Sequence, residues 1–255
     1  MLFEMLIIVV LLIIGVLIYM VRQAFENHLL HHEIRLKGKK EQVKLFFISD
    51  VHLRKINKKM INAINEPIDA VIIGGDFADQ RTPIERIYEN IALLTSIGPV
   101  YFVWGNNDRE IGEERLRTIF KETNVQIVEN NAVILQNVQN KCWISAIDDT
   151  TSRNARQDLA FKNCQQGDIV FFISHNPEVF PIVRKKYNAH LMMGGHLHGG
   201  QIRLGPFGLH PHGSFSIREG VPTLISNGYG TTLIPMRFNA KPQCHIIDVN
   251  FVPET

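Results

Sequence analysis

The chain has 255 residues and a formal charge of +2, from 27 basic and 25 acidic side chains. Its composition, 45% hydrophobic and 20% charged, is that of a folded protein and excludes a largely disordered chain. The small net charge excludes a strong overall positive field, so nucleic acid is not expected as the main partner. Cys142, Cys164 and Cys244 show no Cys-x-x-Cys spacing, which favours buried free thiols and a reducing compartment.

The first apolar segment, Met5 to Val21, has no charged side chain. As a helix, its 17 residues would be roughly 25 Å long, and Leu2 and Phe3 extend it to the length of a membrane span. A cleaved signal peptide is the alternative, but no basic residue precedes the run and no small-residue cleavage site follows it. We therefore predict a transmembrane anchor over residues 1–22.

Basic residues follow the apolar segment and none precedes it. They are Arg22, Arg35, Lys37, Lys39, Lys40 and Lys44. Because flanking Lys and Arg stay preferentially on the cytoplasmic side, we predict a cytoplasmic catalytic domain. Residues 23–42 are predicted to be a basic juxtamembrane linker, and residues 43–255 one domain. Three histidines of this linker, His28, His31 and His32, are interpreted as solvated surface residues.

After the linker, short apolar runs alternate with helical patterns, which is typical of an α/β fold. The predicted strands that end in polar residues are 43–49, 70–74, 100–104, 169–174 and 189–193. Further strands are predicted at 125–128, 132–136, 141–146, 223–226 and 244–250. The predicted helices are 83–97, 112–122 and 177–187, the last made irregular by Pro181.

Polar residues follow five of these strands. They are Asp50, His52, Asp76, Asn106, His175, His196 and His198. In open α/β sheets the ligand site lies at the carboxyl ends of the strands, so we expect these side chains to converge. Mixed oxygen and nitrogen ligands suit Mn, Fe, Zn, Co or Ni. Each short motif alone is weak, but all five in this order favour a metal site.

Together these motifs resemble the calcineurin-like metallophosphoesterases. The matching runs are Asp-Val-His at 50–52, Gly-Asp-Phe-Ala-Asp at 75–79, Gly-Asn-Asn-Asp at 105–108, Ser-His at 174–175 and Gly-His-Leu-His at 195–198. The longer run GGHLHGGQIRLGPFG and the N-terminal apolar segment resemble a bacterial branch of that family. This branch includes membrane-associated phosphodiesterases and a UDP-2,3-diacylglucosamine pyrophosphatase.

The resemblance implies a four-layer α-β-β-α sandwich behind the anchor. It also implies two divalent metals, with manganese the first expectation. Asp50, His52 and His198 would hold one metal, Asn106, His175 and His196 the other, and Asp76 would bridge them. A hydroxide shared by the metals would attack the phosphoryl group in line. Asp79 would orient the loop or a ligand, although a helix-capping role is equally open.

One residue departs from the family pattern. Most members carry a histidine where this chain has Asn107, and that histidine is taken to protonate the leaving oxygen. An amide can donate a hydrogen bond but has no proton to release near pH 7. General acid catalysis at Asn107 is therefore doubtful, and substrates with good leaving groups are favoured. His210 or His212 could substitute for it, but exposed histidines without a role are the simpler interpretation.

Three residues are candidates for binding the substrate. Arg54 and Arg109 lie just past metal motifs and could grip a phosphate, with a plain surface role equally open. His210 is a third candidate. The apolar residues Phe207, Leu209 and Phe215 would suit a lipid-like substrate, although core packing explains them as well.

The sequence thus predicts a membrane-anchored phosphodiesterase or pyrophosphatase acting on a lipid-linked or nucleotide-linked substrate. Two alternatives stay open. One is a non-catalytic metal-binding membrane module that lost its acid at Asn107. The other is a cyclic-nucleotide phosphodiesterase or nuclease, which would use the same metals.

Overall fold

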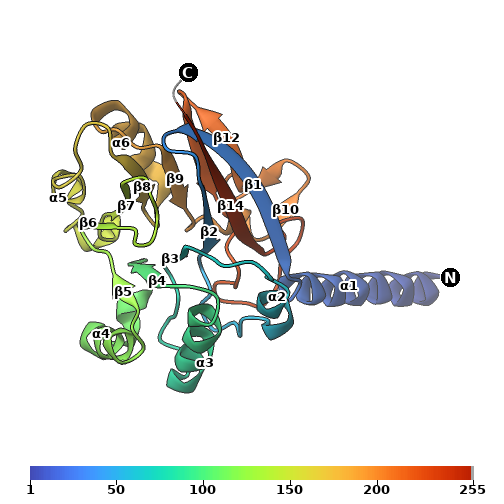
Figure 1. The fold of residues 1–255 in the computed structure, drawn as a ribbon. Helices are drawn as coiled ribbons and strands as arrows, with labels where there is room; N and C mark the ends of the chain where they lie inside the picture. Colours follow the sequence, from blue (N-terminus) through green and yellow to red (C-terminus); the bar gives the residue numbers. More distant parts are fainter. Residues whose placement is uncertain (254–255) are drawn as a thin grey trace.

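The computed structural model describes residues 1–253, and a long helix projects from the rest of the molecule (Figure 1). This helix, α1 (Leu2–Ala24), is exposed along most of its length, and only its end is buried against the domain, at Met20, Gln23 and Ala24. By length and composition α1 could cross a membrane, although a signal sequence would meet the same criteria. The predicted apolar helix is confirmed as a helix.

The first of two six-stranded sheets has the order β1-β14-β2-β3-β4-β5. Its strands are β1 (His28–Lys37), β2 (Gln42–Ile48), β3 (Ala70–Gly74), β4 (Val100–Val103), β5 (Gln126–Ile127) and β14 (Gln243–Val252). Strands β2 to β5 run parallel, β14 is antiparallel to β2, and β1 is parallel to β14. Parallel strands point their carboxyl ends to one edge of the sheet.

The second six-stranded sheet has the order β12-β13-β9-β8-β7-β6. Its strands are β6 (Asn131–Ile134), β7 (Cys142–Ala146), β8 (Ile169–Ile173), β9 (Leu191–Gly194), β12 (Ser214–Arg218) and β13 (Val221–Ile225). The inner four strands are parallel, and β6 and β12 form antiparallel edges. A separate short hairpin pairs β10 (Arg203–Leu204) with β11 (Phe207–Gly208).

Helices cover the outer face of each sheet. Three of them, α2 (Lys58–Asn62), α3 (Ile84–Thr95) and α4 (Glu113–Glu122), lie on the first sheet, as Figure 1 shows. Two others, α5 (Gln157–Ala160) and α6 (Phe180–Lys186), lie on the second. A 3-10 turn at Pro177–Val179 precedes α6, so Pro181 falls in the first turn of α6, where it is tolerated.

Three apolar cores separate these layers. Phe46 and Ile48 pack towards the helices of the first sheet, whereas Leu45 and Phe47 pack between the two sheets. The alternation follows from the period of a strand, which points successive side chains to opposite faces. A third core lies under α5 and α6. The expected four-layer α/β architecture is therefore confirmed.

The residues predicted as a juxtamembrane linker mostly belong to the domain. Residues 28–37 form β1, which pairs with β14 along its whole length. His32 is not a solvated residue, because its ring stacks on Phe215 at 4.2 Å and its Nε2 lies 3.0 Å from Nδ1 of His245. A run rich in His and charged residues resembles a surface segment, and only pairing with the distant C-terminal strand makes it a strand.

Candidate active site

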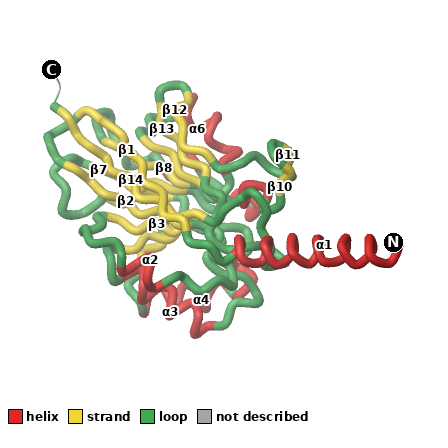
Figure 2. The backbone as a smooth tube through the Cα atoms, turned by 90° about the vertical axis from the view of Figure 1, so that its right-hand side faces the viewer, coloured by secondary structure: helices red, strands yellow, loops and turns green. Residues whose placement is uncertain are grey.

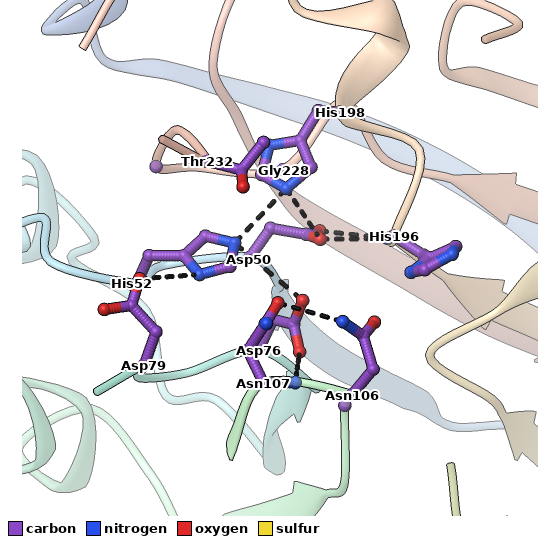
Figure 3. A network of polar contacts seen from close by, with 12 residues as sticks. Asp50, His52, Asp76, Asp79, Asn106, Asn107, His196, His198, Gly228 and Thr232 are labelled. Atoms are coloured by element: carbon purple, nitrogen blue, oxygen red, sulfur yellow. Dashed lines mark hydrogen bonds and ion pairs between the residues drawn. The ribbon is translucent and has the colours of Figure 1, made fainter. Parts of the chain in front are cut away.

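The polar residues that follow the central strands meet between the ends of the two sheets (Figure 3). Each ligand candidate comes directly after a strand. Asp50 and His52 follow β2, Asp76 follows β3, Asn106 follows β4, His175 follows β8, and His196 and His198 follow β9. The two sheets thus contribute to one site, as the convergence of strand ends predicts.

Six of these residues form two compact groups. Within each group the possible ligand atoms lie within 4.8 Å of one another, and the groups are Asp50, His52 and His198, and Asp76, His175 and His196. In the first group, His198 Nε2 lies 3.3 Å from Asp50 Oδ1. In the second, His175 Nε2 lies 3.3 Å from Asp76 Oδ2, and the same oxygen is 3.8 Å from His52 Nε2. Asp76 therefore faces both groups.

The donor atoms fit divalent metals. Nε2 of His52 and Nε2 of His198 lie 3.2 Å apart, as do Nδ1 of His196 and Nε2 of His175. Oδ1 of Asn106 is buried and has no hydrogen-bond partner among the described residues. Imidazole, carboxylate and amide donors brought together in this way suit borderline metals such as Mn, Fe and Zn. As a ligand set, these seven residues remain a proposal.

Neighbouring groups fix the orientation of two of the histidines. Nδ1 of His175 is 2.9 Å from the carbonyl oxygen of Gly74, so Nδ1 carries a proton and Nε2 is the atom directed towards Asp76. Burial opposes protonation of His175, but the Asp76 and Asp50 carboxylates outweigh it and raise the pKa to about 10, so Nε2 also carries a proton, which metal binding would displace. Burial lowers the pKa of His198 to about 3, so this imidazole is neutral.

Asp79 contacts the other side of His52. Its Oδ2 lies 3.3 Å from Nδ1 of His52, and Arg81 holds the same carboxylate through its Nε, its terminal nitrogen and its backbone amide. A carboxylate behind a ligating imidazole sets the tautomer and strengthens the ligand. Of the two roles expected for Asp79, the structure favours orientation of a ligand.

The backbone is strained at the site. Five candidate ligands have φ between 48° and 71°, namely Asp50, His52, Asp76, His196 and His198. Such left-handed conformations cost of order 1–3 kcal/mol each outside glycine and persist only when the surroundings impose them. Gly195 lies so close that a Cβ there would be 2.3 Å from Asp50 Oδ2. The strand-end loops are therefore held tightly around the donors.

Asp108 joins two of these loops. Its fully buried carboxylate accepts hydrogen bonds from the backbone amides of Asp76 (2.8 Å), Phe77 (2.7 Å), Ala78 (3.1 Å) and Gly105 (2.7 Å). The loop after β3 and the loop after β4 are thereby fixed relative to each other. The Gly-Asn-Asn-Asp run contained this residue, but nothing in its spacing distinguished a backbone clamp from a ligand.

The side chain of Asn107 holds its neighbours. Its Oδ1 accepts a 2.9 Å hydrogen bond from Nδ2 of Asn106, and its Nδ2 donates to Glu110 over 2.8 Å. Its backbone amide donates to Asp76 Oδ1 over 2.8 Å. Asn107 thus directs the Asn106 amide so that the oxygen of Asn106 is left for a metal.

Both arginines proposed to bind phosphate are engaged elsewhere. Arg54 is buried and donates to the carbonyls of Tyr229 and Glu26 and to Asn27, so it ties the segment after α1 to the domain. Arg109 donates to Glu113 and Asp148 and lies over the ring of Trp104 at 4.5 Å. Of the two roles expected for each arginine, these contacts with protein acceptors support the structural role.

Arg237 was not anticipated from the sequence. It is fully buried and donates to the carbonyl oxygens of five residues, namely His198, Asn227, Gly228, Gly230 and Ala240. Burial lowers the pKa of Arg237 to about 9, opposed by Asp50. It therefore braces the His198 loop against the segment that follows β13. Arg237 lies outside every recognisable motif, and only its burial identifies it.

A pocket of about 400 Å³ opens beside the histidines. His196 and His198 line it together with His210, Leu209, Leu233 and Ile234. His210 is exposed, which allows it to face a substrate in this pocket. His212 instead lies 3.2 Å from the side-chain nitrogen of Asn227 and is a less suitable replacement for the missing acid.

A family model described as calcineurin-like phosphoesterase matches residues 43–200, which include every candidate ligand. The chain belongs to this family. Family membership makes it a hydrolase of phosphate esters. Members of the family use divalent metals, and the two residue groups are this chain's candidate ligands.

Relatives support the assignment over most of the chain. The uncharacterized protein YpbG of Bacillus subtilis (strain 168) is 37% identical to this phosphoesterase over 87% of each chain. Phosphodiesterase YaeI of Escherichia coli (strain K12) is 23% identical over 81% of this chain and 82% of its own. A third relative, the uncharacterized metallophosphoesterase YkoQ of B. subtilis, is 24% identical over 80% of this chain and 82% of its own.

A solved structure shows a similar fold. The 5'-nucleotidase precursor from Thermus thermophilus superposes with a TM-score of 0.52 and 12% identity, covering 82% of this chain. The phosphoesterase spans 55% of the length of that nucleotidase. At this identity the likeness concerns the fold alone.

Proposed function

We propose that this phosphoesterase hydrolyses phosphodiester or pyrophosphate bonds with two divalent metals, manganese being the first candidate. The observation that carries the proposal is the two ligand groups, which adjoin each other because the Asp76 carboxylate of one group faces His52 of the other. Two bound metals would neutralise charge on the phosphoryl oxygens and lower the pKa of a water nucleophile. In the reaction, water adds to phosphorus, the bond to the leaving oxygen breaks, and that oxygen takes up a proton.

The residues of the chain decide which leaving groups are tolerated. Asn106, Asp76 and the histidines hold the site, and Asn107 positions Asn106 but supplies no proton. A leaving group that is stable as an anion needs no protonation. We therefore propose aryl esters and pyrophosphates as better substrates than alkyl diesters, with a lipid-linked or nucleotide-linked compound as the physiological substrate.

We also propose that α1 anchors the enzyme in the cell membrane, with the domain on the cytoplasmic side. This rests on the exposed apolar surface of α1 and on basic residues that follow it and do not precede it. Protease treatment of intact spheroplasts carrying a C-terminal tag tests the orientation. The tag should survive, and its removal from outside would reverse the proposed topology.

The catalytic proposal is tested with the detergent-solubilised full chain, Mn²⁺ and bis-p-nitrophenyl phosphate. We expect metal-dependent release of p-nitrophenol, loss of turnover on chelation, and loss of turnover in Asp76→Asn. Asp158→Asn is the matched control, because Asp158 is an exposed acid paired with Arg156. Metal binding without turnover under every divalent metal would favour the non-catalytic module instead.

A further inference from the structure

Exposed apolar side chains gather on two segments beside the active-site pocket. Ile202, Leu204, Phe207 and Leu209 belong to the β10–β11 hairpin and its flanks, and Leu233 and Ile234 to the loop before Arg237. These six side chains, here called the apolar rim, are between 41% and 86% exposed. An apolar group of this size at the surface of a folded domain indicates an interaction site.

The rim is continuous with the end of α1. The backbone amide of Arg237 donates to the carbonyl of Met20 over 3.0 Å, and the ring of Tyr19 meets that of Phe238 edge-on at 5.8 Å. The amide of Phe238 in turn donates to the carbonyl of Gln201, at the base of the hairpin, over 2.9 Å. A chain of contacts therefore joins the end of the helix to both halves of the rim.

The two halves of the rim are also tied to each other. Nε2 of Gln201 donates to the carbonyls of Thr232 (3.2 Å) and Ile234 (3.3 Å), and its Oε1 accepts from the amide of Thr232 (3.0 Å). Figures 1 and 2 show the hairpin on the side of the domain towards which α1 extends. A bilayer crossed by α1 would therefore meet the rim.

Both halves of the rim contribute to the lining of the pocket. Leu209 from one half and Leu233 and Ile234 from the other line it together with the buried His198. A polar headgroup at the histidines would thus place an apolar chain between these side chains. Beyond His196 and His198, the lining has three polar residues, Gln201, His210 and Thr232, and is otherwise apolar or glycine.

We propose that the apolar rim rests in the surface of the bilayer that α1 enters. The substrate is then a phosphoester lipid that reaches the ligand groups through the pocket from the plane of the membrane. The substrate part rests on the proposed catalytic function, whereas the docking of the rim rests only on the proposed insertion of α1. The occupant of the rim is the lipid bilayer, because the rim continues the surface of a helix suited to lipid.

Quenching by brominated lipids tests the docking. Full-length Phe207→Trp is reconstituted into phosphatidylcholine and phosphatidylglycerol vesicles with brominated acyl chains, and Ile217→Trp is the control. Ile217 is 73% exposed, close to the 77% of Phe207, but lies on β12, away from α1 (Figure 2). The buried Trp104 and Trp143 give the same background in both variants.

We expect the added emission to be quenched at residue 207 and not at residue 217. Absence of quenching at both positions overturns the docking. Equal quenching at both also overturns it, because the rim would then be no more lipid-exposed than the far side of the domain.

Activity on matched substrates tests the access route. Phosphatidyl-p-nitrophenol in vesicles and soluble bis-p-nitrophenyl phosphate share a leaving group and differ in the lipid. Leu204 and Phe207 lie in the hairpin but do not line the pocket. In Leu204→Ser/Phe207→Ser, the vesicle rate should fall about tenfold, since burial of large apolar side chains changes an equilibrium by at least that factor. The soluble rate should be unchanged, as should both rates in Ile217→Ser.

Equal loss on both substrates, or no loss on either, overturns the access route. Failure of the parent enzyme to hydrolyse the vesicle lipid while it hydrolyses the soluble diester overturns the lipid substrate and leaves the proposed function standing. If residue 207 is quenched but neither substrate is hydrolysed, the docking of the rim stands and the proposed function fails.

Discussion

The absence of a proton donor at position 107 can be tested by substitution. Asn107→His should raise the rate on alkyl phosphodiesters by up to about 10²-fold, since a histidine adds general acid catalysis. Aryl diesters, whose leaving groups need no proton, should respond less. Steady-state rates on the two substrate classes measure this. Asn188→His places a histidine at an exposed position remote from the site and should change neither. An unchanged alkyl rate in Asn107→His would refute our account.

Asp79 is expected to act through His52. Asp79→Asn should weaken binding of one metal by about 10–100-fold, the usual effect of losing a carboxylate behind a ligating imidazole. Calorimetric metal titration measures the change. Asp158→Asn is the control, because Asp158, like Asp79, is paired with an arginine two residues away but lies at an exposed site. It should leave the affinities for both metals unchanged. Equal affinities in Asp79→Asn and the parent would exclude the orienting role.

The element-level prediction concerns the two loops that Asp108 joins. Asp108→Asn turns an NH2 group towards backbone amides that need an acceptor, and each unpaired buried donor costs about 1–3 kcal/mol. We expect the free energy of unfolding to fall by about 2 kcal/mol or more, measured by urea denaturation of detergent-solubilised protein. Glu114→Gln, an exposed change in the adjacent helix α4, should have little effect. Equal urea midpoints for Asp108→Asn and the control variant would contradict the role of Asp108 in holding the two loops together.

Elements differ in how far the sequence reveals them. The strands β2, β3, β4 and β8 were predicted because parallel strands buried on both faces appear as continuous apolar runs. Strand β1 was missed because its mixed pattern becomes a strand only against β14, more than 200 residues later.

The residues of the site also differ in how far the sequence predicts their positions. Short ligands such as Asp50 and His52 are placed by their strand, so their position in the sequence predicts their position in space. Arg54 and Arg109 have long side chains, and the acceptors available in the folded protein decide where their guanidinium groups point. Arg237, which lies outside all the motifs, is identified only by its burial.

At the scale of the whole molecule, Arg237 connects α1 with the site. Arg237→Met keeps most of the side-chain volume but leaves several buried carbonyls unpaired, so we expect a loss of about 3 kcal/mol in unfolding free energy and weaker metal binding. Urea denaturation and metal titration measure the two effects. Arg218→Met, on the exposed strand β12, is the control and should be close to the parent. If the metal affinity of Arg237→Met equals that of the parent, Arg237 does not brace the site.

The position of β14 between β1 and β2 has a consequence for synthesis. While the ribosome is still making the chain, α1 has already emerged, yet the strand that joins β1 to the rest of the first sheet is translated more than 200 residues after β1. A chain that ends at residue 242 should stay bound to the membrane, expose two unpaired strand edges, and be degraded or aggregate. Pulse-chase proteolysis of this truncation checks the expectation. With α1 as the proposed anchor, membrane insertion would precede completion of the first sheet, and the newly made protein would become a phosphoesterase only at the surface where we propose that it works.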